Sequence, residues 1–312
     1  MSEKLKLQGE FDVLGDVLQT LRFRGSIFFN SDLAAPWGMS LEKQDALRFH
    51  IVLLGDCFVG ASGQETVKAG SCDIVMLPNG GPHWIADKPG RKMTPSTRAG
   101  AACELGNPLF QKGTITNRLV CGMVHFDRNA PHPIMRELPE VMHFPMLESA
   151  ESIWSVIKLI EAELSSHQGR SNHIADRLTE VLFMQLLDNH VQHNQDSTGF
   201  LAALRDRRVH HALTLIHQEP AFAWSLSTLG DRSGMSRATL VRRFNDVIGV
   251  SPMVYISDWR VMKANSLIRS TTLSLEQVAN ATGFASARTL STAFKRHYGC
   301  TPGDLRRSQT KL

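Results

Sequence analysis

Arginines and small hydroxyl residues gather in two short stretches of the C-terminal third of the chain. The first reads SRATLVRRF, residues 236–244, and the second reads SARTLSTAFKR, residues 286–296. Arginine donates paired hydrogen bonds to guanine edges or to phosphate oxygens, and alanine and threonine methyl groups contact thymine methyls. These residue types therefore predict recognition of a nucleic acid rather than the transformation of a substrate.

The two stretches share one spacing, which makes them copies of a single unit. In each copy a leucine precedes a phenylalanine by four residues, and apolar residues at i and i+4 lie on one helix face, here the predicted core face. A glycine and a proline follow the phenylalanine by five and eight residues. The residues of this frame are Leu240, Phe244, Gly249 and Pro252 in the first copy, and Leu290, Phe294, Gly299 and Pro302 in the second.

A helix, a tight turn and a second helix are predicted around each stretch. In the second copy Ser274 caps the first helix, Gln277 closes a capping box, and Gly283 ends the helix in the left-handed conformation. Ser286 then caps the second helix, and the small Ala279 allows the two helices to approach. The matching positions of the first copy are Ser225, Gly230, Gly234, Ser236 and Gly249.

In such a motif the second helix enters the major groove of DNA, and its first turns reach the base edges. A helix over residues 253–270, roughly 27 Å long, can hold two reading helices in successive groove segments, about 34 Å apart. The residues expected to read bases are Arg237, Ala238, Val241, Arg242, Ala287, Arg288, Thr289 and Thr292. Those expected to contact phosphates are Ser236, Arg243, Ser286, Lys295 and Arg296.

The distribution of charge supports a polyanionic partner for the C-terminal third. Residues 205–312 hold 16 Lys and Arg against 7 Asp and Glu, whereas residues 1–204 hold 18 against 23. A basic segment of this kind attracts nucleic acid. The rival interpretation, a helical bundle with solvated basic faces, explains the charge but not the duplication.

Composition excludes other classes of protein. No run of 18 or more apolar residues is present, and the N-terminus has no apolar signal-peptide core, so we expect a cytoplasmic protein. Five scattered cysteines without a CxxC pair indicate reduced thiols rather than a disulfide framework or a zinc finger.

The first 200 residues predict a different architecture. A short amphipathic helix is expected over 11–24, and β-rich runs over 47–61, 72–86 and 118–127. Residues 87–116 predict a long mobile loop. Two further helices over 150–165 and 173–192 precede a polar linker over 192–199, and the second helix is apolar on more than one face.

The stretch GFASARTLSTAFKRHYGCTPGDLRR, residues 283–307, resembles the signature of AraC/XylS-type transcription regulators. That resemblance covers about residues 205–307. The P-x-G-x-x-H pattern of Pro78, Gly80 and His83 is similar to the second motif of cupin β-barrels, which such regulators often carry as effector domains. The implied fold is multidomain: a cupin-like β-barrel sensor over 1–149, a helical pair and linker over 150–199, and an all-α tandem helix-turn-helix domain over 200–312.

The resemblance implies a regulator that binds a promoter or operator in double-stranded DNA and responds to a small-molecule or chemical signal. It also implies a homodimer, formed through the helices of 150–192, and contact with RNA polymerase. Because the HxH pair and glutamate of the first cupin motif are missing, we expect no enzyme activity, no cofactor and no metal.

Two sets of residues in the sensor are candidates for the signal. His50, His83 and His125 can converge inside a barrel as an effector pocket, with His50 on the same strand face as Arg48. Cys57 and Cys121 lie in predicted strands and are expected to be buried. A basic neighbour such as His50 or His83 would lower a thiol pKa, so a cysteine-based redox sensor stays open as an alternative. A metallo-cupin enzyme with a DNA-binding tail is the second alternative.

Overall fold

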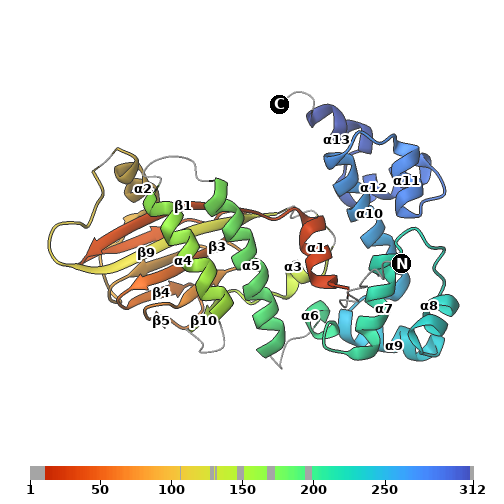
Figure 1. The fold of residues 1–312 in the computed structure, drawn as a ribbon, viewed down its shortest axis with the longest axis horizontal. Helices are drawn as coiled ribbons and strands as arrows, with labels where there is room; N and C mark the ends of the chain where they lie inside the picture. The colour runs from red at the N-terminus through yellow and green to blue at the C-terminus, as the bar shows by residue number, and fades with distance from the viewer. Residues whose placement is uncertain are drawn as a thin grey trace, which may run out of the picture. The chain divides into compact units, whose positions relative to one another are not determined.

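The chain folds into two compact units (Figure 1). The computed structural model describes residues 11–105, 107–126, 130, 132–145, 151–166, 173–193 and 199–309. The sheet unit consists of residues 23–126 and 138–189. The helical unit consists of residues 1–22, 127–137 and 190–312.

Two five-stranded sheets build the sheet unit. One has the order β1-β9-β3-β6-β10, and the other has the order β5-β4-β7-β2-β8. All pairs are antiparallel except β2 with β8. The strands are β1 (Arg24–Ala34), β2 (Gly38–Leu41), β3 (Leu47–Leu54), β4 (Cys57–Ala61), β5 (Val67–Ala69), β6 (Ile74–Leu77), β7 (His83–Ala86), β8 (Thr94–Pro95), β9 (Ile115–His125) and β10 (Met142–Phe144).

The core of this unit lies between the inner faces of the two sheets. Strand β3 crosses its centre, with His50 paired to Cys121 of β9 on one side and to Val75 of β6 on the other. Arg48, His50 and Val52 are all buried, as expected for alternate residues of one strand face. The core cluster contains Phe29, Leu33, Trp37, Met39, Leu41, Val52, Cys57, Val59, Ala69, Val75, Leu77, Ile85, Ala99, Leu119 and Cys121.

Helices α4 (Glu151–Ser166) and α5 (His173–His193) pack against the sheet that contains β1 and β9. Gly25 of β1 allows the close approach of α5, because a Cβ there would lie 2.6 Å from the Asp176 carbonyl oxygen and from Thr179 Cβ. The Gly25 amide donates to Glu180 Oε1 at 3.3 Å. The two helices predicted from apolar spacing are therefore part of this unit.

The segment 87–116 is not a structureless loop, which corrects the sequence-based prediction. It contains β8 and helix α2 (Ser96–Glu104), and Ala99 of that helix is buried in the sheet core. Glycine and threonine have low helix propensity, so the local sequence does not predict α2. The packing of Ala99 in the core stabilises this helix.

The helical unit is built around the long helix α10, which contacts α1, α9, α11, α12 and α13. A core cluster of this unit contains Val261, Ala264, Ile268, Val278, Ala279, Leu290, Phe294 and Leu305. The helices are α1 (Val13–Leu21), α3 (Ile134–Glu137), α6 (Gly199–Ala203), α7 (Arg207–Gln218), α8 (Leu226–Ser233), α9 (Arg237–Ile248), α10 (Pro252–Ser270), α11 (Leu275–Thr282), α12 (Ala287–Tyr298) and α13 (Pro302–Gln309).

The contacts divide the chain differently from the three consecutive segments predicted from the sequence. Residues before 23 and residues 127–137 group with the C-terminal helices, and residues 151–189 group with the sheets. Helix α1 packs on α7 and α10, and α3 packs on α6. Periodicity alone identifies an amphipathic helix but not the surface that covers its apolar face.

Candidate nucleic-acid interface

Helices α8 and α9 form the first helix-turn-helix. Ser225 caps α8, and its capping box with Thr228 is complete. Gly234 ends α8 in the left-handed conformation, with φ of 70°. Gly230 must be small, since a Cβ there would lie 2.7 Å from the Met235 carbonyl oxygen. The turn expected from the glycines and serines is therefore formed.

Helices α11 and α12 form the second helix-turn-helix with the same local chemistry. Ser274 and Gln277 make the predicted capping box of α11. Gly283 ends that helix with φ of 78°, and Ser286 caps α12. The residue at the end of α12, Gly299, is also left-handed, with φ of 71°.

The apolar frame of the repeat faces the core in both units. Leu240, Phe244, Leu290 and Phe294 each have an exposed fraction of 0%. Burial of this face fixes which side of α9 and α12 meets solvent. The repeated leucine and phenylalanine therefore determine which face of α9 and of α12 is exposed to solvent.

The side chains predicted to read bases lie mainly on the solvent-facing side. Arg237, Ala238 and Arg242 of α9 are exposed, and Val241 is half-buried. In α12 Arg288, Thr289 and Thr292 are exposed, and Ala287 is half-buried.

Some of these polar groups already have partners within the chain. Arg237 Nη2 donates to Ser227 Oγ at 2.8 Å. Thr289 Oγ1 belongs to the cap of α12, and Thr292 Oγ1 donates to the Arg288 carbonyl at 3.0 Å. Of the three exposed arginines predicted to read bases, Arg242 and Arg288 have no side-chain hydrogen bond to another described residue.

The residues predicted to contact phosphates occupy varied environments. Ser236 and Ser286 use their Oγ atoms as caps, each accepting an amide at 3.2 Å. Arg243 is half-buried and forms an ion pair with Asp206 at 2.8 Å, so part of its charge is neutralised. Lys295 and Arg296 are exposed.

Arg260 of α10 contacts both helix-turn-helix units. Its Nε donates to the Pro220 carbonyl at 2.8 Å, and its Nη2 donates to the Phe222 carbonyl at 2.6 Å, both in the segment that enters α8. A Cβ on Gly283, in the turn of the second unit, would lie 2.8 Å from Arg260 Cζ. One guanidinium therefore touches the linker helix, the entry to the first unit and the turn of the second.

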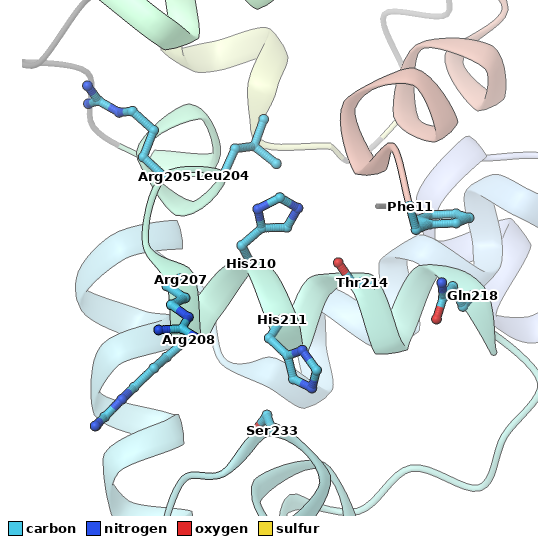
Figure 2. Close-up of a pocket in the computed structure, with 10 residues that line it drawn as sticks. All are labelled: Phe11, Leu204, Arg205, Arg207, Arg208, His210, His211, Thr214, Gln218 and Ser233. Carbon is cyan, nitrogen blue, oxygen red and sulfur yellow. The ribbon is translucent and has the colours of Figure 1, made fainter. Parts of the chain in front are cut away.

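An open pocket of about 900 Å³ lies along α7 (Figure 2). Its described lining contains three arginines and two histidines and no carboxylate, and His211 points toward Ser233. The run RDRRVHH, residues 205–211, is the sequence signal for this surface, and it lies outside both copies of the repeat. The lining consists of Phe11, Leu204, Arg205, Arg207, Arg208, His210, His211, Thr214, Gln218 and Ser233.

A chain of hydrogen bonds links α1 to α7 and α10. Asp16 accepts from Lys263 Nζ at 2.6 Å and from His217 Nδ1 at 3.0 Å. His217 Nε2 then accepts from the Tyr255 hydroxyl at 2.8 Å, and Tyr255 Oη accepts from His132 at 3.2 Å. Burial would raise the pKa of Asp16, but the hydrogen bonds from His217 and Lys263 bring it below its usual value. The sequence pattern does not predict this chain, because its members are 38 to 247 residues apart.

Glu137 of α3 holds the start of α6 in a similar way. The Phe200 amide donates to Glu137 Oε2 at 2.6 Å. Gly199 leaves room for this carboxylate, since a Cβ there would lie 2.0 Å from Glu137 Cδ. Burial raises the pKa of Glu137 to about 7, and the hydrogen bonds from Phe200 and Leu201 oppose that rise.

In the sheet unit, two of the three predicted histidines come together. His50 Nε2 lies 2.8 Å from His83 Nε2, and both side chains are buried. His125 does not join them, because it lies at the end of β9 with its side chain exposed. Alternation places His125 on the same strand face as Cys121, but His125 is the last residue of β9, and its side chain is exposed there.

The hydrogen bonds fix the tautomers of this buried cluster. The Gly81 carbonyl can only accept, so His83 Nδ1, 2.8 Å away, carries a proton. Neutral His83 then accepts at Nε2 from His50, and His50 Nδ1 accepts from the Cys121 thiol at 2.9 Å. Burial lowers the pKa of both imidazoles, that of His83 to about 4, and raises the pKa of the Cys121 thiol. The cluster is therefore neutral at pH 7.

Cys57 is also buried in the sheet core, with an exposed fraction of 0%. Burial, with a smaller contribution from Asp56 and Asp73, raises its pKa to about 12. Within the described parts of the chain, no group of three His, Cys, Asp or Glu side chains has the arrangement of a metal site. None of the described helices is long and apolar enough to cross a membrane.

Residues 12–192 match the family described as Cupin, and residues 229–308 match the family described as Helix-turn-helix domain. A putative AraC-like transcription regulator of Streptomyces antibioticus is 28% identical over 310 residues, covering 95% of this chain and 98% of that protein. The HTH-type transcriptional regulator AlkR of Acinetobacter baylyi is 26% identical, covering 93% and 97%. The RCS-specific HTH-type transcriptional activator RclR of Escherichia coli is 25% identical, covering 96% and 99%.

Two solved structures are similar to the C-terminal third and to most of the chain, respectively. The DNA-binding domain of AdpA in complex with a target DNA is 27% identical, with a TM-score of 0.33, and covers 34% of this chain and 95% of that one. Fatty acid-bound ToxT from Vibrio cholerae is 12% identical, with a TM-score of 0.38, and covers 93% and 96%.

Proposed function

Because the chain belongs to the AraC-type family of DNA-binding transcription regulators and carries an N-terminal cupin domain, we propose that it reads one operator through both α9 and α12 and responds to a signal sensed in the sheet unit. The observation that carries the proposal is the pair of helix-turn-helix units with matching caps, each presenting an exposed arginine, Arg242 or Arg288, on its second helix. Such a protein acts in the cytoplasm, where its operator lies.

Affinity for DNA at several salt concentrations tests the proposal on the full chain. Phosphate contacts make the affinity fall steeply with salt, and base contacts make a selected site bind more tightly than a scrambled one at every salt concentration. The double variant Arg242→Ala with Arg288→Ala should lose most of that discrimination while keeping the salt dependence. Lys92→Ala, in the sheet unit, is the matched control and should behave as the wild type. Equal affinity of the wild type for both sequences would refute base reading.

The signal is proposed to reach the reading helices through the two segments of the N-terminal half that pack in the helical unit. Helix α1 leads directly into β1, and residues 127–137 follow β9. The facing ends of those strands are paired, Arg24 with His125. A ligand shifts the DNA-binding equilibrium only if it binds one of two conformational states more tightly. Both segments are continuous with strands of the sheet unit, so they can transmit such a difference to the helical unit.

Asp16→Asn tests this route because it weakens the contacts of α1 with Lys263 and His217. The variant should still bind operator DNA but should lose most of the response to the signal. A full response in the variant would show that α1 does not carry it.

The redox alternative has one observation in its favour, the 2.9 Å contact of Cys121 with His50. The direction of that hydrogen bond weighs against it, because the thiol donates and its raised pKa leaves no thiolate to react. Under oxidant, Cys57→Ser and Cys121→Ser should therefore leave the response unchanged. Loss of an oxidant response in either variant would favour the redox alternative.

A homodimer is the proposed assembly, formed by α4 and α5. Apolar side chains on these helices face solvent: Leu159 with an exposed fraction of 54%, Ile174 with 56%, and Val181 and Met184 with 38% and 39%. Ile174, Val181 and Met184 recur at helical spacing along α5. Sedimentation of the wild type and of Val181→Glu with Met184→Glu tests this: the variant should be monomeric. Contact with RNA polymerase is proposed from the family alone.

A further inference from the structure

Arg48 is a buried cation that has no counter-ion among the described residues. Its exposed fraction is 4%, and neither Nε nor Nη1 has a hydrogen-bond partner among the residues that the structure describes. Arginine keeps its proton in proteins, so the charge cannot be removed by titration. Burial lowers the pKa of Arg48, and the nearby Cys121 thiol, whose own pKa is raised by burial, stays protonated and supplies no negative charge.

The surroundings of Arg48 offer little compensation. Its partners in the sheet are apolar, Leu77 on β6 and Met123 on β9. The cluster next to it is neutral, and its acceptor atoms are already used in the hydrogen bonds among His50, His83 and the Cys121 thiol. The Phe28 ring, with its centroid 5.8 Å from Arg48 Cζ, gives only a weak cation–π contact.

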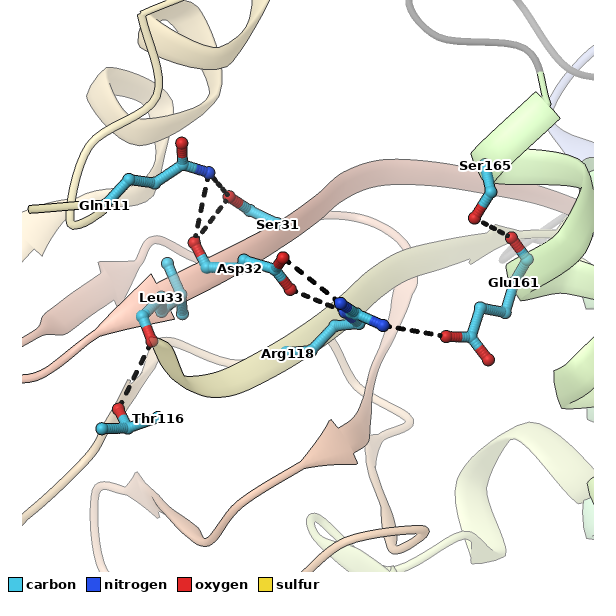
Figure 3. Close-up of polar contacts among 8 residues, drawn as sticks. All are labelled: Ser31, Asp32, Leu33, Gln111, Thr116, Arg118, Glu161 and Ser165. Atoms are coloured by element: carbon cyan, nitrogen blue, oxygen red, sulfur yellow. Dashed lines mark hydrogen bonds and ion pairs between the residues drawn. The ribbon is translucent and has the colours of Figure 1, made fainter. Parts of the chain in front are cut away.

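Arg118 of the same unit shows how an arginine is normally satisfied (Figure 3). Its Nε donates to Asp32 at 2.6 Å, and its Nη1 donates to Glu161 at 3.3 Å. This guanidinium is partly exposed and still has two carboxylates. Arg48 is far more buried and has no carboxylate partner in the described part of the chain, although an unpaired charge costs more free energy inside a protein than at its surface.

Part of the surroundings of Arg48 is exposed to solvent. Phe28, beside it, has an exposed fraction of 37%. The turn after β6 passes Ala46, two residues before Arg48, since a Cβ on Gly80 would lie 2.1 Å from the Ala46 carbonyl oxygen. In the same turn a Cβ on Gly81 would meet no atom within 4 Å.

We propose that the sheet unit binds a small organic carboxylate, whose anionic group pairs with Arg48 beside the neutral His50–His83 pair. The inference rests on the proposed function, in which the sheet unit senses a small molecule, and names the chemical class of that molecule. A carboxylate supplies acceptors for the unpaired Nε and Nη1 donors and neutralises the buried charge. The imidazoles and the apolar inner face then distinguish one carboxylate from another.

Thermal unfolding of the full chain with sodium benzoate tests the proposal, with sodium chloride at equal ionic strength and the uncharged benzamide as ligand controls. Benzoate should raise the unfolding midpoint of the wild type in a concentration-dependent way, because a ligand that binds only the folded state stabilises it. Benzamide should give no comparable shift. This comparison needs no variant.

Two variants sharpen the result. Arg48→Met should lose at least tenfold in benzoate affinity, whereas Arg118→Met, which removes the paired arginine, should keep it. Without added anion Arg48→Met should unfold at or above the wild-type midpoint, because it removes an unpaired buried charge. A clearly lower midpoint for Arg48→Met would show that Arg48 is already satisfied in the free protein and would overturn the inference.

Two further outcomes would also overturn it: benzoate stabilising Arg48→Met as much as the wild type, or benzoate shifting the midpoint of neither. Operator affinity without anion should be the same for the wild type and Arg48→Met. Intact DNA binding with no benzoate effect therefore rejects the carboxylate site alone, whereas loss of sequence-specific binding by the wild type rejects the proposed function.

Discussion

The first and second helix-turn-helix units use the same serine caps and glycine ends, yet their turn glycines lie in different surroundings. A Cβ on Gly234 would meet no atom within 4 Å, whereas a Cβ on Gly283 would lie 2.8 Å from Arg260 Cζ and 2.9 Å from Ala221 Cα. A side chain added at Gly234 would therefore meet open space. Gly283, in contrast, packs against the linker helix α10 and against the segment that precedes α8. The difference teaches that local sequence sets the shape of each unit, while tertiary contacts set how much each residue matters.

The largest effect is expected in the shared frame, where the comparison predicts no difference between the units. Phe244→Ala and Phe294→Ala each remove a ring with an exposed fraction of 0%. Each should lower the free energy of unfolding by about 3–5 kcal/mol. Urea denaturation of the full chain followed by far-ultraviolet circular dichroism measures both. A loss below about 1 kcal/mol in one unit would show that its frame is not a true core position.

The turn glycines should separate the units. Gly234→Ala should cost about 1–2 kcal/mol, the penalty of a side chain in the left-handed conformation. Gly283→Ala should cost about 1–3 kcal/mol more, because its Cβ also meets Arg260 and the backbone of Ala221. The two variants serve as controls for each other in the same denaturation experiment. Equal losses would contradict the packing difference.

Arg260 should couple the units in DNA binding. Arg260→Met removes two charged hydrogen bonds, to the Pro220 and Phe222 carbonyls, and should cost about 1.5–3 kcal/mol of stability. It should also let the protein tolerate one inserted base pair between the two blocks of its operator. Arg269→Met, on the same helix, is the control and should keep the wild-type preference for spacing. Unchanged discrimination in Arg260→Met would mean that α10 alone fixes the spacing.

The smallest effect is expected at the caps, which are equivalent in the two units. Ser225→Ala and Ser274→Ala each break a complete capping box. Each should cost about 1 kcal/mol. Thermal unfolding followed by circular dichroism should show similar shifts for both. A much larger loss at one serine would indicate a role beyond capping.

The sequence was most informative where structure is local. The caps Ser225, Ser236, Ser274 and Ser286 are confirmed because a cap depends on residues three positions away. The burial of Leu290 and its counterparts follows from helical periodicity in the same way.

Features that depend on contacts between residues far apart in the chain could not be predicted from the sequence. Helix α2, within 87–116, depends on packing of Ala99 in the sheet core. The attachment of α1 depends on Asp16 meeting Lys263, which is 247 residues away. The three-histidine pocket failed at His125 because strand ends, unlike strand alternation, are not encoded in the pattern. The unpaired charge of Arg48 could not be predicted either, since it depends on which side chains do not reach it.

The most direct test of the central claim, that both units read bases, is selection of bound sites from a random DNA pool with the full chain, run in parallel for the wild type, Arg242→Ala and Arg288→Ala. The wild type should select two blocks about one helical turn apart. Arg242→Ala should relax one block and Arg288→Ala the other, each by about 1–3 kcal/mol at its cognate position. A wild-type motif with a single block, or two variants that weaken all sequences equally, would contradict the account.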